Sequence, residues 1–130
     1  MAKFLKLYSD GFTLGANPSP RGGGYTICAD DGSLVKTETF QKQWFTNNEG
    51  EVRGIIEALK FLEDGGEVIT DSFCAMRWVT NGRAKPRHDL SELLREGQKL
   101  LSGKKITLEP RETNLAGQYN EFNLEKRYTI

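Results

Sequence analysis

Histidine and cysteine are scarce in this sequence. Its 130 residues include one histidine, His88, and two cysteines, Cys28 and Cys74. A single histidine excludes a histidine-based metal cluster. The two thiols have neither the spacing of a zinc site nor the number that a disulfide framework needs. We therefore expect a reduced, cytoplasmic protein, because disulfide-rich domains belong to oxidising compartments. The N-terminus is interrupted by lysines and does not resemble a signal peptide.

The sequence also lacks an excess of one charge and a long hydrophobic run. Eighteen Lys and Arg residues balance 18 Asp and Glu residues. This balance disfavours nucleic-acid binding through bulk charge but leaves room for a local basic surface. The apolar runs are far shorter than the ~20 residues of a membrane span. The composition, 37% hydrophobic and 28% charged, is that of a globular protein, and the length predicts one domain over residues 1–130.

The hydrophobic pattern changes along the chain between strand and helix periods. Glycines and prolines between residues 11 and 24 predict a loop after the first strand. We expect strands at 4–8, 25–29, 34–40, 67–70 and 105–108, and helices at 49–62, 72–80, 89–101 and 115–127. The order is therefore βββαβααβα. It predicts an α/β fold with a five-stranded mixed sheet and helices packed on it.

Helix ends and buried positions are predicted from local signals. Thr46, Asn47 and Asn48 offer N-cap side chains for the first long helix, and Gly65-Gly66 is expected to end it. In the next helix, Phe73 is expected to be partly buried together with Met76 and Trp78. Asn81-Gly82 should end that helix.

Three acidic residues stand at the ends of predicted elements. Asp10 is expected to close the first strand, Asp71 closes the fourth, and Glu51 lies in the first turn of the long helix. If these two strands are parallel neighbours, the three carboxylates meet. Three carboxylates repel one another unless a cation joins them, and hard oxygen ligands select Mg²⁺ or Mn²⁺. Taken singly, each acid is more simply a turn, capping or helix-dipole residue, so the joint pattern carries the prediction.

Four segments resemble, in the same order, the motifs of the type 1 ribonuclease H family. The Thr-Asn-Asn-x-x-Glu pattern and the Thr-Asp-Ser strand end are among them. The segments are Tyr8-Ser9-Asp10-Gly11 with the glycine-rich stretch 15–24, then Thr46 to Glu51, Ile69 to Ser72, and Pro110 to Ala116. The resemblance runs over nearly the whole chain and implies a ribonuclease H-like fold.

The resemblance also implies an activity and a set of site residues. The expected activity is hydrolysis of the RNA strand of RNA–DNA hybrids by two Mg²⁺ or Mn²⁺ ions, which Asp10, Glu51 and Asp71 would hold. The protein would act as a monomer without an obligate protein partner. The residues expected to contact the hybrid are Gly11, Asn17, Asn47 and Asn48. The asparagines would do so in the minor groove, where the 2′-hydroxyl marks RNA. Read without the family, Asn17 is a turn residue, and Asn47 and Asn48 are helix caps.

The sequence departs from the family pattern in the last loop. The family has a fourth carboxylate shortly after the asparagine of this loop, where Gly117 and Gln118 stand here. Glu121 is the nearest acid. It either replaces the missing catalytic and metal-binding carboxylate, since one helical turn brings it towards the same face, or it is a solvated surface residue. The histidine that many relatives carry in this loop is also absent, and His88 lies elsewhere.

One dense basic segment follows the second helix. Arg83, Lys85 and Arg87 are predicted to contact substrate phosphates, with an ordinary solvated loop as the alternative. Trp78 either lines a phosphate channel or belongs to the core.

Two other functions fit the same sequence. A binding module of this fold would hold the hybrid with weak or no cleavage, because the fourth carboxylate is displaced. A related nuclease would keep the metal chemistry and act on a different nucleic acid.

Overall fold

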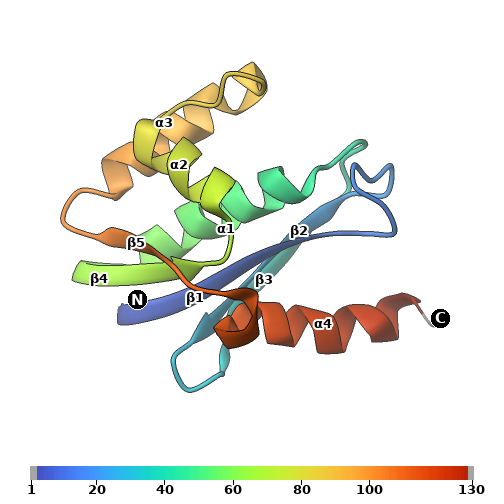
Figure 1. Ribbon diagram of the computed structural model, residues 1–130, viewed down its shortest axis with the longest axis horizontal. Coiled ribbons are helices and arrows are strands. Elements are labelled where there is room, and N and C mark those ends of the chain that lie inside the picture. Colours follow the sequence, from blue (N-terminus) through green and yellow to red (C-terminus); the bar gives the residue numbers. More distant parts are fainter. Residues whose placement is uncertain (1–2, 129–130) are drawn as a thin grey trace.

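The computed structural model describes residues 3–128, and its elements follow the predicted order (Figure 1). The strands are β1 (Phe4–Thr13), β2 (Gly23–Ala29), β3 (Leu34–Phe40), β4 (Leu62–Thr70) and β5 (Lys105–Leu108). The helices are α1 (Asn47–Phe61), α2 (Phe73–Asn81), α3 (Ser91–Leu100) and α4 (Leu115–Tyr128), with 3₁₀ turns at His88–Leu90 and Arg111–Thr113. The predicted α/β class is confirmed. None of the helices within residues 3–128 has the length and hydrophobicity needed to cross a membrane.

The sheet has the strand order β3-β2-β1-β4-β5. Strand β1 is central, antiparallel to β2 and parallel to β4. Its pairing with β4 stops at Tyr8, which faces Ile69, whereas its pairing with β2 continues to Thr13. The prediction that Asp10 closes the first strand is therefore wrong, because β2 carries β1 three residues further. Asp10 instead lies just beyond the point where β1 and β4 part, and Asp71 directly follows β4.

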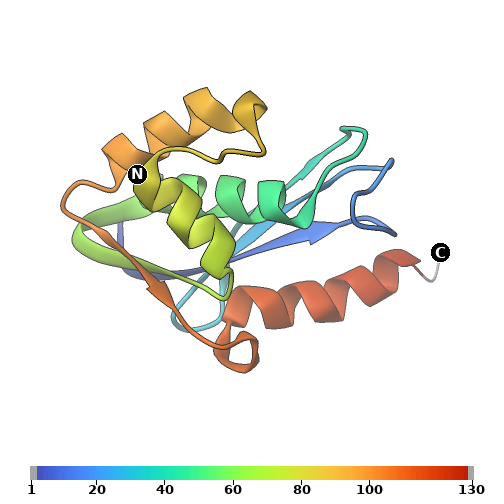
Figure 2. The same cartoon turned by 45° about the horizontal axis from the view of Figure 1, so that its top comes forward.

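The two faces of the sheet carry different helices. Helices α1, α2 and α3 lie on one face and α4 lies on the other (Figures 1 and 2). Neighbouring residues alternate between these faces, as a pleated strand requires, so Leu7 belongs to one cluster and Tyr8 to the other. The main core includes Leu7, Ile27, Val52, Ile55, Leu59, Val68, Val79 and Leu94. The smaller cluster beneath α4 contains Tyr8, Cys28, Ile69 and Ala116.

Glycines bring the beginning of α1 into close contact with the sheet. A Cβ atom on Gly11 would overlap the backbone nitrogen of Glu51, and one on Gly50 would lie 2.5 Å from the carbonyl oxygen of Gly24. Side chains at these positions would hold the helix away from β1 and β2. The close approach places the first turn of α1 beside Asp10.

The ends of α1 agree only in part with the prediction. Thr46 caps the helix, since its Oγ1 accepts a hydrogen bond of 3.1 Å from the backbone N–H of Glu49. The helix ends at Phe61, before the predicted Gly65-Gly66, because Leu62 is extended and fully buried at the start of β4. An apolar residue at this spacing suits either a helix or a strand, so the pattern did not separate them.

Helix α2 begins and ends as expected, and Met76 and Trp78 are partly buried as predicted. Ser72 caps it, and Gly82 ends it in the left-handed conformation, with φ of 69°. Ala75 and Val79 form its buried face. Phe73 does not share that face and is 55% exposed, so the prediction that it is partly buried in the core is wrong.

Candidate functional site

Asp10, Glu51 and Asp71 come together where β1 and β4 diverge. Each offers a carboxylate oxygen, and these atoms lie within 4.8 Å of one another. Asp10 and Glu51 are almost completely buried and Asp71 is half-buried. The meeting of the three acids, predicted from their places at element ends, is confirmed.

Hydrogen bonds hold the Glu51 carboxylate against the sheet. Its Oε1 accepts a bond of 2.7 Å from the backbone N–H of Gly11, and the Thr70 hydroxyl donates to its Oε2 at 3.4 Å. The Thr70 oxygen in turn accepts from the backbone N–H of Ser72 at 3.1 Å. Thr70 at the end of β4 and Gly11 in β1 therefore orient the same side chain.

The electrostatics of the cluster favour a bound cation. Burial raises the pKa of Asp10, and repulsion from Asp71 adds to this effect, while a hydrogen bond from Asn120 opposes it. Burial and then the charge of Asp10 raise the pKa of Glu51 well above its usual value. Burial also raises the pKa of Asp71, although the Arg111 guanidinium opposes this. Three acids that share a poorly solvated space are held against their mutual repulsion, and a cation would relieve it.

An unsatisfied oxygen also fits a metal site. Oδ2 of Asp71 is buried, and no residue within the described range 3–128 gives it a hydrogen bond. Buried polar atoms are otherwise nearly always paired, so this oxygen has the properties of a ligand atom. The donors are carboxylate oxygens, which suit hard divalent cations. The acidic cluster therefore indicates a metal site.

Asn120 is a site residue that the sequence analysis missed. It lies on α4, is 5% exposed, and its Nδ2 donates to Oδ2 of Asp10 at 2.8 Å. Its Oδ1 accepts from the Thr26 hydroxyl at 2.6 Å. Asn120 is an amide, whereas the family pattern calls for a carboxylate in this region. The signal was its position one helical turn after the buried Ala116.

Glu121 lies beside the three-acid group and outside it. Its carboxylate is 62% exposed and forms an ion pair of 3.2 Å with Arg111. Both residues line a shallow hollow next to Asp10, together with Gly11, Asn47 and Asn120. The structure thus places Glu121 on the surface, at the rim of the site.

The last loop fastens α4 to β1. Asn114 is fully buried, and its Nδ2 donates to the carbonyl oxygen of Ser9 at 3.0 Å. Its Oδ1 accepts from the N–H groups of Ala116 and Gly117, which are in the first turn of α4. A Cβ atom on Gly117 would lie 3.7 Å from Cγ of Asp10. This part of α4 therefore passes directly beside the acidic cluster.

The asparagines predicted to contact substrate lie around the beginning of α1. Oδ1 of Asn17 accepts a bond of 3.0 Å from the backbone N–H of Asn47, which joins the loop after β1 to the helix. The alternative that Asn47 or Asn48 caps α1 is wrong, because Thr46 does so. Both asparagines are half-buried in the first turn.

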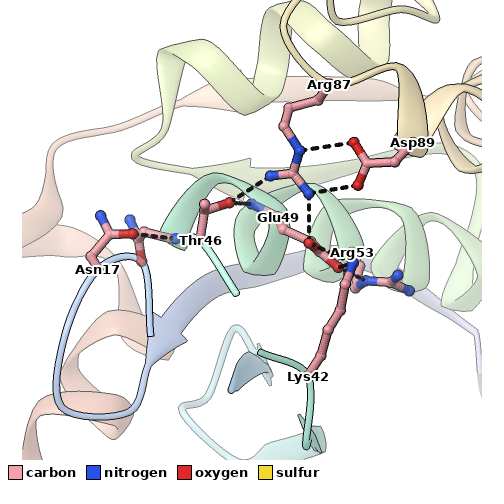
Figure 3. Close-up of polar contacts among 8 residues, drawn as sticks. Asn17, Lys42, Thr46, Glu49, Arg53, Arg87 and Asp89 are labelled. Atoms are coloured by element: carbon pink, nitrogen blue, oxygen red, sulfur yellow. Dashed lines mark hydrogen bonds and ion pairs between the residues drawn. The ribbon is translucent and has the colours of Figure 1, made fainter. Parts of the chain in front are cut away.

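The three basic residues after α2 have different surroundings. Arg83 and Lys85 are exposed and line a hollow between α2 and this loop, together with Phe73, Arg77 and Trp78. Arg87 points instead towards α1, and its guanidinium contacts Glu49, Thr46 and Asp89 (Figure 3).

No protein-family model matches the chain. A ribonuclease H of Sulfurovum sp. (strain NBC37-1) is 41% identical over 78 residues. The match covers 54% of this chain and 47% of that relative, so it spans about half the length of the curated protein.

Solved structures resemble the chain over a longer range. The crystal structure of RNase H1 from the halophilic archaeon Halobacterium salinarum NRC-1 is 29% identical, with a TM-score of 0.63 over 88% of this chain and 91% of that chain. LC11-RNase H1 in complex with an RNA/DNA hybrid is 22% identical, with a TM-score of 0.55 over 84% and 87% of the two chains, and shares the fold. The chain, with its five-stranded sheet and three converging acids, therefore resembles ribonucleases H1 in sequence over about half of its length and in fold over most of it.

Proposed function

We propose that this protein is a metal-dependent endoribonuclease that cleaves the RNA strand of RNA–DNA hybrids. The convergence of Asp10, Glu51 and Asp71 within 4.8 Å, in a chain that resembles ribonucleases H1, carries the proposal. A pure binding module would gain nothing from three clustered, poorly solvated carboxylates, whereas a phosphodiesterase needs them to hold cations.

The chemistry follows from what each residue does at the cluster. We assign Asp10, Glu51 and Asp71 as ligands of Mg²⁺ or Mn²⁺, with two ions as the working number. When bound, such ions supply an activated water and stabilise the leaving oxygen. Gly11 fixes the orientation of Glu51 through its N–H group, and Asp71 offers an oxygen that no residue in the described range engages. Catalysis would then rest on positioning and charge neutralisation.

Gly117 and Gln118 supply no fourth carboxylate, and the α4 side chain that contacts Asp10 is the amide of Asn120. Its amide is neutral and donates to Asp10, so the residues around the metal site carry one negative charge fewer than four carboxylates would. We expect this to weaken the hold on a second cation. Glu121, at the rim, is 62% exposed and paired with Arg111, so it contributes less than the three buried acids.

The substrate would lie along the beginning of α1 and the adjoining loops. Gly11 and Asn47 line the hollow beside Asp10, and Asn17 is tied to Asn47. Amide groups donate and accept hydrogen bonds, as reading a 2′-hydroxyl in a minor groove requires. We further propose Asn48 as a groove contact. The exposed Arg83 and Lys85 would neutralise phosphates. The solved complex of LC11-RNase H1 with an RNA/DNA hybrid supports this class of substrate.

A cleavage assay tests the proposal. The purified protein is incubated with a labelled RNA–DNA hybrid, duplex RNA, duplex DNA and single-stranded RNA, in Mg²⁺ and in Mn²⁺. We expect only the RNA strand of the hybrid to be cut. Asp10→Asn should abolish cutting and preserve hybrid binding, because the amide removes a ligand charge without changing the shape. Tight hybrid binding without cutting by the wild type would favour the binding module, and cutting of another substrate would favour a different nuclease.

We also propose that residues 1–130 form one domain that acts as a monomer. Light scattering after gel filtration, with and without a short hybrid, measures the mass of the active species. A dimeric mass would contradict this part of the proposal.

A further inference from the structure

Glu49 is a buried carboxylate surrounded by three cations. It is 0% exposed in the first turn of α1. Lys42 Nζ lies 2.8 Å from Oε2, Arg53 Nε lies 3.0 Å from the same oxygen, and Arg87 Nη2 lies 2.7 Å from Oε1 (Figure 3). Burial alone would raise the pKa of Glu49, but the hydrogen bonds from Lys42, Arg87 and Arg53 outweigh it and lower the pKa. The carboxylate is therefore charged and fully engaged.

The three cations come from different parts of the chain. Lys42 follows β3, Arg53 lies one turn further along α1, and Arg87 belongs to the loop between α2 and α3. Arg53 therefore pairs with Glu49 within one helix, and its guanidinium also lies over the Phe40 ring at 4.8 Å. Lys42 and Arg87 connect separate segments. Glu49 thus joins two loops to the beginning of α1.

Arg87 makes the most specific of these contacts. One Nη atom donates to Thr46 Oγ1, the N-cap of α1, at 2.8 Å, while the other donates to Glu49. Its Nε and Nη2 also contact the two oxygens of Asp89, each at 2.9 Å. A planar guanidinium carries five donors on three nitrogens in fixed directions, whereas a lysine carries three donors on a single nitrogen. We call the Arg87–Glu49–Thr46 contact the latch.

The latch joins the two segments that carry the proposed substrate contacts. Residues on one side of Glu49 in the first turn are Asn47 and Asn48, and Glu51 follows on the other side. On the loop, Arg87 lies two and four residues after Lys85 and Arg83. The latch therefore sets the position of the proposed phosphate contacts relative to the proposed groove contacts.

Stability alone does not account for such a network. Buried ion pairs are often no more stabilising than apolar residues of the same volume, because the desolvation of both charges offsets their attraction. What a buried pair does fix is geometry, since each charge must find its partner. A substrate surface that is already in place before binding avoids the cost of ordering a loop.

We propose that Glu49 and Arg87 are positioning residues. They hold the loop that carries Arg83 and Lys85 against the beginning of α1, so that the hybrid binds to a preformed surface. This inference rests on the proposed hybrid cleavage. It gives Arg87 a different role from Arg83 and Lys85, since it acts through Glu49 and not on the phosphates.

A set of four single variants and one double variant tests the latch. We expect Arg87→Gln and Glu49→Gln each to raise the KM for the hybrid several-fold and to leave kcat within about twofold. In these variants the substrate-binding loop would lose its fixed position, whereas the three acids of the metal site would keep theirs. The double variant should be no worse than the worse single, because both changes remove one contact. Arg53→Gln is the matched control. It also takes a cation from Glu49, but it releases no loop, so its KM should stay near that of the wild type.

Arg87→Lys separates positioning from direct phosphate contact. A lysine keeps the positive charge and loses the planar arrangement of donors on three nitrogens. If Arg87 positions the loop, Arg87→Lys should behave like Arg87→Gln. The reverse result, wild-type affinity with lysine, would overturn the latch. This variant keeps the test decisive even if thermal melting shows that Glu49→Gln does not fold.

The salt dependence of binding gives a second readout. Hybrid affinity is measured in an Asp10→Asn background, which prevents cleavage. Removal of one phosphate contact lowers the slope of log K against log salt by about 1. We expect Arg83→Gln to do so and Arg87→Gln to leave the slope unchanged. A lower slope for Arg87→Gln, or a wild-type KM in both latch variants, would refute the inference. If the wild type neither binds nor cuts the hybrid, the proposed function itself has failed.

Discussion

Asn120 and Glu121 are neighbours on α4 that meet opposite environments. Asn120 is buried between Asp10 and Thr26, whereas Glu121 is exposed beside Arg111. A helix turns by about 100° per residue, so one position separates the acidic cluster from solvent. The residue type at a position therefore says less about its role than the face on which it lies.

This pair gives a test at the scale of single side chains. Asn120→Ala removes a donor to Asp10 and leaves the Thr26 hydroxyl without this acceptor, so we expect a loss of ~1–3 kcal/mol in stability and at least a tenfold loss of cleavage. Glu121→Gln should cut within about twofold of the wild type, because its carboxylate is solvated. Initial rates on a labelled hybrid and thermal melts measure both. A large loss of rate in Glu121→Gln would show that Glu121 serves the site.

At the scale of elements, glycine affects stability in opposite directions in two helices. Gly50 in α1 contacts the sheet so closely that a Cβ atom would lie 2.5 Å from the Gly24 carbonyl oxygen. Gly117 in α4 has room, since a Cβ atom would lie 3.6 Å from Asn114 Cβ and 3.7 Å from Asp10 Cγ. The first glycine is required by helix–sheet packing, and the second only weakens the helix that carries it.

Alanine substitutions should therefore change stability in opposite directions. We expect Gly117→Ala to stabilise the protein by ~0.5–1 kcal/mol, the helix propensity gain, because nothing obstructs the methyl group. Gly50→Ala should destabilise it by ~1–3 kcal/mol through overpacking, and it should also lower cleavage, since Glu51 would move away from Asp10. Urea unfolding of the two variants measures both signs. If Gly50→Ala were as stable as the wild type, the packing of α1 on the sheet would be loose enough to accept a methyl group.

At the scale of the whole molecule, the acidic cluster links stability to pH and to metal. The pKa values of Asp10, Glu51 and Asp71 are all raised in the folded state, first through burial. When the pKa of an acid is higher in the folded than in the unfolded state, the protonated acid contributes to stability at pH values below its unfolded pKa, near ~4. This contribution is lost as the pH rises through the folded pKa. At neutral pH without metal, the ionised cluster therefore lowers the free energy of unfolding.

Thermal melts of the metal-free protein should show this loss of stability. We expect Asp10→Asn to melt a few degrees higher than the wild type at pH 7.5, since ~1 kcal/mol shifts Tm by about 2–8 °C, and the difference should shrink towards pH 4. Mg²⁺ or Mn²⁺ should raise the Tm of the wild type at pH 7.5 and have less effect on Asp10→Asn, because a ligand stabilises the state that binds it. An equal metal effect on both proteins would place the cation elsewhere.

Much of the architecture was predictable because its signals are local. The strand and helix periods specified the element order, and the three acids were predicted to meet, although Asp10 does not end its strand. The Glu49–Arg87 contact spans 38 residues and the Asn120–Asp10 contact 110 residues, so neither leaves a local signal. The extension of β1 past Asp10 depends on its pairing with β2, and the early end of α1 depends on the burial of Leu62. These features follow from tertiary contacts.

The attachment of α4 has a consequence for the timing of events at the site. In the part of the chain that the structure describes, α4 alone covers its face of the sheet, and the apolar cluster beneath it is small. Such a helix is a candidate for a separate cooperative unit, whose amide hydrogens exchange with solvent through a local opening cheaper than global unfolding. Each opening would take Asn120 away from Asp10 and admit water to the carboxylates. The ionisation of the acidic cluster would then depend on whether α4, which lies on the face of the sheet opposite the main core, is docked.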